Sequence, residues 1–409
     1  MDTLQIVFMV FSYAVFALAA FFIVRRAIKP LPVPFPRSSS RNTCLTIFAI
    51  AVLSRVVLLL INWGAKALLG NPGTLLDTWF RWDADNFTGI ATQGYWSAEL
   101  GWKRIVFLPL YPMAVRLMTL GFIDVKLAAM IVSSLSLGGA CVTLYKLVLL
   151  DADEAAARRA VKFLLLFPVT VFLGAPFTES MFLLLSFACL YHMRKRQFLP
   201  ACIFGLLAAL TRNVGVLLAL PVFVEMLRAD GFLPGGGVKR LWKRFAGHVA
   251  MLLLIPLGTA GYLLMNYLLT GDAFMFLQME KLWSQSFGSY GNSLGVTWGQ
   301  IVSESNILRD KLTLWGSQFA VMVIAGATLP VLCRKMRASY GLYALAYFFV
   351  IFAPTWLLSG FRYTMGLAVL YPALALLTRR RWADIALTAV FAALMPVYTY
   401  CFSVGWLIF

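Results

Sequence analysis

The run Arg81-Trp82-Asp83-Ala84-Asp85 places two carboxylates, a guanidinium and an indole within five residues. It lies in a polar loop between long apolar stretches, and such groups are costly to keep beside a bilayer unless they act on something polar. Asp83 and Asp85 are therefore candidate catalytic residues, and Arg81 and Trp82 are candidate substrate-binding residues. On a helix, Arg81 would lie four residues from Asp85 and would form an ion pair with it.

The spacing of Asp83 and Asp85 also fits a divalent cation shared with a substrate phosphate. Two carboxylates are few ligands for a protein-held Mg²⁺, so we expect no required cofactor and treat a metal as the less favoured alternative. The charges could instead only cap and solvate a loop helix. The neighbouring arginine and tryptophan argue against that interpretation, because they add nothing to solvation.

Other polar residues are expected at the outer ends of apolar segments. Arg212, followed by Asn213, and Glu179 lie at the tips of two hairpins. Arg212 then either pairs with Glu179 or contacts a substrate phosphate. Arg362, followed by Tyr363, lies in the last outer turn, where a guanidinium can bind phosphate oxygens through two parallel hydrogen bonds. If the substrate carries a phosphate, we favour Arg362 over Arg212 as its ligand.

A second long polar loop carries Gln278 and Lys281. These two residues are expected either to line a substrate wall or to be solvated. Asp272, directly after Gly271, is expected to cap a short helix. The candidate functional charges therefore gather at one boundary of the membrane.

The elements that position these residues are membrane helices. The chain has 409 residues, of which 61% are hydrophobic and 13% charged, and its mean hydropathy is +0.83. Soluble domains carry about 25% charged residues, so the composition indicates an all-α polytopic membrane protein. The net charge of +18 lies mainly in short loops. It therefore reflects topology and attraction to anionic membrane lipids, and we expect no nucleic-acid partner.

The apolar segments predict about twelve transmembrane helices, within a range of about 10 to 13. The expected spans are 4–24, 43–62, 127–149, 161–177, 180–193, 198–211, 214–227, 247–269, 313–333, 340–358, 364–378 and 383–406. Several of these segments are short for a helix that crosses a bilayer.

Most of the 35 Lys and Arg residues fall in alternate loops, such as 25–42, 228–244 and 379–381. By the positive-inside rule these loops are cytoplasmic, so both termini and the outer loops 63–126 and 270–312 face outward. The polar site would then lie on the periplasmic, extracellular or lumenal side. A bacterial inner membrane is the expected location.

Residues 1–42 are predicted to form a membrane anchor helix followed by a basic, Pro-rich cytoplasmic linker, and residues 43–409 to form the transmembrane body. The charges follow the first apolar stretch, which disfavours a cleaved signal peptide. The six cysteines lie within apolar spans or at their ends without metal-ligand spacing, so we expect them to pack as small hydrophobes.

The first outer loop is expected to contain short helices. Segment 84–92 predicts a helix that ends at Gly94. Pro109 and Pro112 would break 105–123 as a spanning helix. We therefore place 105–123 in the outer interface as an amphipathic or re-entrant helix.

Short motifs follow one another in order between about 75 and 375. They are Trp82-Asp83-Ala84, Ile90-Ala-x-x-Gly94-Tyr95, Phe107-Leu-Pro-Leu-Tyr-Pro112, Phe177-Thr-Glu-Ser180, Ala209-Leu-Thr-Arg-Asn-Val-Gly215, Gly271-Asp-Ala-Phe-Met-Phe-Leu-Gln278 with Trp283, Ser359-Gly-Phe-Arg-Tyr363 and Leu370-Tyr-Pro372. Each motif is weak alone, but the ordered set resembles the PIG-V-type mannosyltransferases of the GT-C glycosyltransferase superfamily.

This resemblance implies a GT-C-like helical bundle with short interfacial helices in the first outer loop. It also implies an enzyme that moves a hexose, mannose in the family, from a polyprenyl-phosphate donor to an acceptor hydroxyl on the outer face, with inversion. The acceptor would be a lipid or a glycan. The Trp-Asp motif points to Asp83 as the general base, with Asp85 as the alternative.

The histidines support a carboxylate base independently of the resemblance. The chain has two, His192 and His248, and both are predicted at cytoplasmic ends of spans. No imidazole is then expected on the outer face, so a carboxylate must accept the proton if the protein is an enzyme. A phosphate ester leaves without protonation, so one base suffices and contributes about 10²–10⁴-fold.

Two alternatives without chemistry are a twelve-span secondary transporter and a lipid flippase. Transporters bind substrates near the midplane, between repeated halves of the fold. The chain shows no clear internal repeat, and the candidate functional charges are expected at the outer boundary of the membrane. Arg55 is the exception, because it lies inside the second predicted span. Uptake that depended on Arg55 would favour a transporter.

Overall fold

The computed structural model describes residues 3–29, 39–71, 73–233, 242–281, 287–354 and 356–408. Within these ranges the protein is helical and has no β-strand. Two isolated antiparallel β-bridges join Ser97 to Gly101 and Phe287 to Pro354. Most of the predicted linker, residues 30–38, and the motif residue Trp283 lie outside the described residues.

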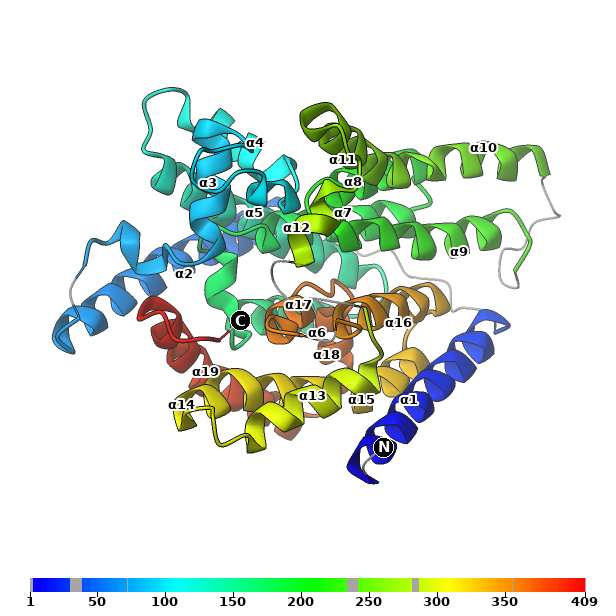
Figure 1. Cartoon of the computed structure of the whole chain (residues 1–409). Helices are drawn as coiled ribbons and strands as arrows, with labels where there is room; N and C mark the ends of the chain where they lie inside the picture. The colour runs from blue at the N-terminus through cyan, green and yellow to red at the C-terminus, as the bar shows by residue number, and fades with distance from the viewer. Residues whose placement is uncertain are drawn as a thin grey trace.

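The α-helices, labelled as in Figure 1, are α1 Thr3–Ala27, α2 Arg41–Leu68, α3 Asp83–Gln93, α4 Leu110–Thr119, α5 Val125–Leu149, α6 Glu154–Leu166, α7 Glu179–Arg194, α8 Phe198–Ala209, α9 Ala219–Ala229, α10 Trp242–Leu252, α11 Leu254–Thr270, α12 Met275–Glu280, α13 Tyr290–Val302, α14 Leu308–Asp310, α15 Ser317–Lys335, α16 Ala338–Phe352, α17 Gly360–Met365, α18 Leu370–Leu377 and α19 Arg381–Ser403. Tighter 3₁₀ turns are η1 Leu76–Trp79, η2 Lys103–Val106, η3 Thr170–Leu173 and η4 Asn213–Leu218, and η6 Lys311–Gly316 is a π-helical turn that leads into α15.

Six helices in the described ranges are long and apolar enough to cross a membrane. They are Thr3–Ala27, Arg41–Leu68, Val125–Leu149, Trp242–Thr270, Leu308–Lys335 and Arg381–Ser403. The composition-based prediction of an all-helical membrane protein is confirmed. The expected number of about twelve spans is not, because many of the remaining helices are shorter than a bilayer requires.

The expected spans 161–177 and 364–378 are interrupted by non-helical backbone, and the expected span 340–358 is helical only to Phe352. Segment 161–177 is helical only to Leu166, because Pro168 disfavours a helical conformation at Phe167 and cannot donate a backbone hydrogen bond. Segment 364–378 contains α18, which has only eight residues, after a break that includes Gly366. Both breaks place irregular backbone inside the bundle.

The core of the bundle is formed around α5, α7 and α8. Most residues of α7 are buried, which is typical of a helix surrounded by other helices. Gly258 allows α11 to approach α8 closely, because a Cβ atom there would lie 2.5 Å from the carbonyl oxygen of Leu206. The interior is therefore packed through backbone contact as well as through side chains.

The N-terminal helix α1 packs along α13, α15 and α16. In Figure 1 it is the blue helix beside the yellow and orange C-terminal segments. The predicted boundary between an anchor and a body near residue 42 stays a prediction. Helix α1 contacts the rest of the bundle over its length.

The first outer loop folds as expected into short helices. Helix α3 ends at Gly94, whose φ of 90° is readily adopted by glycine. Helix α4 has only ten residues and begins next to Pro109, so segment 105–123 does not span. The Leu110 N–H donates to the carbonyl of Leu210 at 3.2 Å, which ties this loop to the end of α8.

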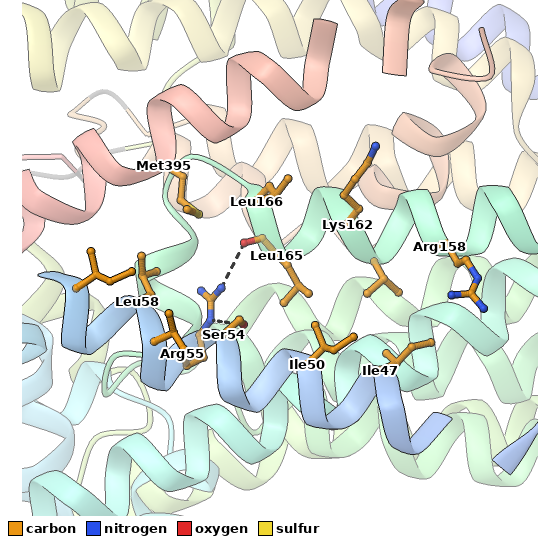
Figure 2. A pocket seen from close by; sticks show the side chains of 13 residues that line it. Ile47, Ile50, Ser54, Arg55, Leu58, Arg158, Lys162, Leu165, Leu166 and Met395 are labelled. Atoms are coloured by element: carbon orange, nitrogen blue, oxygen red, sulfur yellow. Dashed lines mark hydrogen bonds between the residues drawn. The ribbon is translucent and has the colours of Figure 1, made fainter. Parts of the chain in front are cut away.

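The buried Arg55 on α2 has a structural role. Its guanidinium donates to the Thr170 carbonyl at 3.0 Å, to the Thr170 hydroxyl at 2.9 Å and to the Leu165 carbonyl at 3.3 Å. These carbonyls become available because helix α6 has ended. Figure 2 shows Arg55 in the wall of an apolar groove of about 540 Å³ between α2, α6 and α19. Arg55 thus donates hydrogen bonds to backbone carbonyls that the break after α6 would otherwise leave unpaired.

Replacing Arg55 with Met should lower the thermal unfolding midpoint of the purified protein in detergent. The substitution leaves the Leu165 and Thr170 carbonyls without donors, at a cost of about 1–3 kcal/mol for each unpaired buried group. Arg158→Met is the matched control, since Arg158 on α6 is 61% exposed and pairs with Glu154 at the surface. Equal midpoints for the two variants would contradict the role given to Arg55.

Candidate active site

Four charged side chains from four separate segments meet at one end of the bundle. Arg362 on α17 donates through Nη1 to Asp83 Oδ2 at 2.9 Å, and through Nε to Glu179 Oε1. Arg212, just before η4, donates through Nη1 to the same Glu179 oxygen and to the Thr178 hydroxyl at 3.0 Å. The pair between Arg212 and Glu179, one of the two alternatives expected for Arg212, is present, and the link from Arg362 to Asp83 joins residues that are 279 positions apart.

Glu179 is the buried centre of this cluster. It begins α7, where a carboxylate interacts favourably with the helix dipole, and its side chain is fully buried. The Arg362 guanidinium lies over the Phe177 ring at 4.6 Å, and the Arg212 guanidinium lies over the Tyr363 ring at 5.4 Å. The ring contacts and the shared carboxylate fix both guanidiniums in place.

Asp83 is the accessible carboxylate of the cluster. It is the first residue of α3, and its side chain is 32% exposed. The preceding Trp82 has a φ of 49°, a left-handed conformation that costs a bulky residue about 1–3 kcal/mol. Its indole packs edge-on against Phe402 at 4.9 Å and stacks on Phe172 at 6.4 Å. This packing holds the strained turn that leads into Asp83.

The predicted ion pair between Arg81 and Asp85 is wrong. Arg81 donates through Nη2 to the Ser403 carbonyl at 2.7 Å, at the end of α19, and Asp85 is exposed. The left-handed turn at Trp82 places Arg81 outside α3, so helical spacing to Asp85 does not apply. Arg81 instead anchors the segment that precedes α3 to the end of the C-terminal helix α19.

A cavity of about 570 Å³ opens above Asp83. Its lining includes six of the predicted residues, namely Trp82, Asp83, Arg212, Asn213, Arg362 and Tyr363. The rest of the lining comes from Asn86, Phe87, Val106, Phe107, Leu108, Thr178, Thr211, Val214, Glu280, Tyr347, Val350, Ile351, Pro354, Leu358 and Ser359. Arg81, Asp85, Glu179, Gln278 and Lys281 are not part of the lining. Asn86 could have been found from sequence, because it follows Asp83 by three residues on a helix.

The second outer loop contributes Glu280 to this cavity in place of the two residues predicted there. Gln278 donates to Asp272 Oδ2 at 2.7 Å and is exposed, as is Lys281. On helix α12, Gln278 and Lys281 share one face, and Glu280 lies about 200° around the helix from Gln278. Burial raises the pKa of the Glu280 carboxyl above its ordinary value.

The geometry gives little support to a metal held by Asp83 and Asp85. The two side chains lie about 200° apart around α3, and Asp83 is bound to Arg362. Within the described ranges, no group of three or more His, Cys, Asp or Glu side chains is placed to hold a metal ion. Metal dependence stays a question for experiment.

Replacing Glu179 with Gln should destabilise the protein more than replacing Asp83 with Asn. The first change leaves Arg212 and Arg362 without their shared buried counter-charge, at a cost of about 3–5 kcal/mol. The second leaves Arg362 paired with Glu179, and Asp83 is partly exposed. Unfolding midpoints in detergent measure both effects. The reverse order of the two midpoints would show that Glu179 is not the structural centre.

Comparisons with known proteins agree with this picture. Residues 69–233 match the family model for mannosyltransferase (PIG-V). GPI mannosyltransferase 2 of Schizosaccharomyces pombe is 27% identical over 147 residues, which cover 35% of this chain and 31% of that protein's length. The match to this curated relative therefore spans about a third of its length.

The structure of ArnT from Cupriavidus metallidurans bound to undecaprenyl phosphate is similar to 90% of this chain and 78% of that chain, at 13% identity and a TM-score of 0.51. The archaeal oligosaccharyltransferase AglB from Archaeoglobus fulgidus, in complex with an inhibitory peptide and a dolichol-phosphate, aligns over 89% of this chain and 55% of that chain at 14% identity, with a TM-score of 0.46. The resemblance to the PIG-V mannosyltransferases predicted from the motifs is confirmed by the family match over residues 69–233, and the fold is similar to that of ArnT.

Proposed function

We propose that the protein is a membrane glycosyltransferase that moves a hexose, mannose by the family match, from a polyprenyl-phosphate donor to an acceptor hydroxyl with inversion. The observation that carries the proposal is the placement of Asp83. It is the carboxylate of the Trp-Asp motif, it lines the cavity, and Arg362 holds one of its oxygens. The family match over residues 69–233 includes this motif.

Asp83 would act as the general base. Arg362 binds Oδ2 and fixes the carboxylate, which leaves Oδ1 to accept the proton of the acceptor hydroxyl. As the acceptor hydroxyl oxygen attacks the anomeric carbon of the donor sugar, the bond between this carbon and the phosphate oxygen breaks. The polyprenyl phosphate then leaves as an anion. No general acid is needed, and the rest of the rate enhancement comes from holding donor and acceptor in line.

The donor phosphate would bind to Arg212 rather than to Arg362, contrary to the preference from sequence. Arg362 is 6% exposed and already contacts two carboxylates. The Arg212 side chain is 14% exposed, lines the cavity and contacts one carboxylate, so it has donors left for phosphate oxygens. The undecaprenyl phosphate in the ArnT structure supports a polyprenyl-phosphate donor.

The site would face outward. Helix α7 begins at Glu179 in the site and ends at Arg194, about 24 Å away along the helix axis. Arg194 belongs to a basic cluster with Arg337, which also pairs with Asp151. By the positive-inside rule this basic end would be cytoplasmic, and Asp83 would then lie on the opposite side, which supports an outward-facing site.

Asp83→Asn should reduce hexose transfer from a polyprenyl-phosphate hexose by about 10²–10⁴-fold, because the amide cannot accept the proton. Asp85→Asn is the matched control, since Asp85 is exposed and outside the cavity lining. Transfer of radiolabelled mannose by purified variants with equal unfolding midpoints measures the effect. Normal transfer by Asp83→Asn would disprove the assignment of the base.

Cysteine labelling in intact cells or spheroplasts should confirm the orientation. A Cys at the exposed position Glu99 should react with a membrane-impermeant maleimide, and a Cys at the exposed position Lys195 should react only after the membrane is opened. The native protein is the background control, since five of its six cysteines are buried and Cys44 is partly buried. The opposite labelling pattern would invert the topology.

A further inference from the structure

Glu280 is a carboxylate with no role in the proposed transfer reaction, although it shares the cavity with Asp83 and Arg212. It ends α12, beside Val106 and Phe107 in the cavity lining. Among the described residues it has no hydrogen bond or ion pair. An ionised carboxylate can only accept hydrogen bonds, so Glu280 offers its oxygens to whatever fills the cavity.

The position of Glu280 is fixed by buried contacts below α12. The fully buried Asn266 accepts from the Phe276 N–H at 3.3 Å, and the Phe276 ring packs against Tyr262 at 5.3 Å. The Tyr262 hydroxyl in turn donates to the Ile105 carbonyl at 2.7 Å. These contacts attach α12 to both α11 and η2, so Glu280 is held against the cavity rather than on a solvated loop.

We propose that Glu280 selects the acceptor by accepting hydrogen bonds from the hydroxyls of an uncharged sugar, and that it excludes acceptors with an anionic group beside the reacting hydroxyl. This rests on the proposed function, in which Arg212 takes the donor phosphate. A carboxylate repels phosphates and other anions, so the Glu280 wall suits the neutral substrate. Hydroxyl donors would also relieve the desolvation that raises the pKa of this carboxyl.

Glu280 is thus a specificity-determining residue rather than the base. The cavity offers a different charge to each of the two substrates. The guanidinium of Arg212 binds the donor phosphate, and the carboxylate of Glu280 accepts hydrogen bonds from the acceptor hydroxyls. Sites built to hydrogen-bond a hydroxyl reject ligands that cannot supply it, because their polar groups are left unpaired. The substrate class expected here is a neutral glycan or the neutral sugar of a glycolipid headgroup.

The test is the binding of neutral alkyl glycosides, with mannose, glucose or N-acetylglucosamine headgroups, and of their 6-phosphates to the purified protein by calorimetry. Glu280→Ala should weaken the best neutral ligand about 10- to 100-fold, the loss expected for a hydrogen bond to a charged group. Glu280→Gln, which keeps an acceptor oxygen, should recover part of this loss. Glu280→Lys should improve binding of the phosphorylated ligand. Gln278→Ala is the matched control on the opposite face of α12 and should bind like the native protein.

Equal binding of neutral glycosides to the native protein and Glu280→Ala would overturn the proposal. Stronger binding of the 6-phosphates by the native protein would overturn it too, as would the absence of binding across the whole panel. Transfer assays with polyprenyl-phosphate mannose separate this proposal from the proposed function. There Glu280→Ala should raise KM for the acceptor and leave KM for the donor unchanged. Glycoside binding that depends on Glu280, without any transfer by the native protein, would reject the transferase and keep the neutral-sugar site.

Discussion

The fully buried carboxylate of Glu179 is the constraint on which the site depends. A buried charge without partners costs several kcal/mol, so the fold must bring cations to it. It receives Arg212 and Arg362, which lie 33 and 183 residues away in sequence. The ends of α8 and α17 are thereby tied to the start of α7. Arg362 then extends the network to Asp83, so the position of the proposed base depends on a charge that never contacts the cavity.

The two carboxylates of this network, Glu179 and Asp83, differ in how far they are buried, and this difference gives them different roles. Glu179 accepts from two guanidiniums, one of which lies over the Phe177 ring, and it acts as an internal counter-charge. Asp83 shares Arg362 but lies at the cavity, with a third of its side chain exposed. The cluster of two carboxylates and two guanidiniums carries no net charge, which allows it to exist among aromatic rings. Arg362, which the sequence predicts as a phosphate ligand, instead pairs inside the protein with Glu179 and with Asp83, the proposed base.

Local patterns in the sequence predicted the parts of the site that depend on local structure. The Trp-Asp motif, the helix that ends at Gly94 and the pair between Arg212 and Glu179 at neighbouring hairpin tips were all found in this way. The link from Arg362 to Asp83 could not be found, because nothing local specifies a contact across 279 residues. The sequence predicts Gln278 and Lys281 in this wall and not Glu280, because nothing in the sequence shows which side of the six-residue helix α12 faces the cavity.

The departures from regular membrane helices are explained by the same site. Apolar segments 161–177 and 364–378 predict spans, yet both break close to the charged cluster. The backbone groups of an unbroken helix would pair with one another. The break after α6 instead leaves two carbonyls without helical partners, and Arg55 donates hydrogen bonds to them. Irregular backbone is tolerated in a membrane protein where other parts of the protein cover it, and residues 167–173 and 366–369 are buried. Helix α12 lies outside this constraint, since it is attached through Asn266 and Tyr262 to α11 and η2. The proposed acceptor wall can therefore change without moving the proposed base, whereas the two breaks adjoin Glu179 and Arg362, the residues that connect to Asp83.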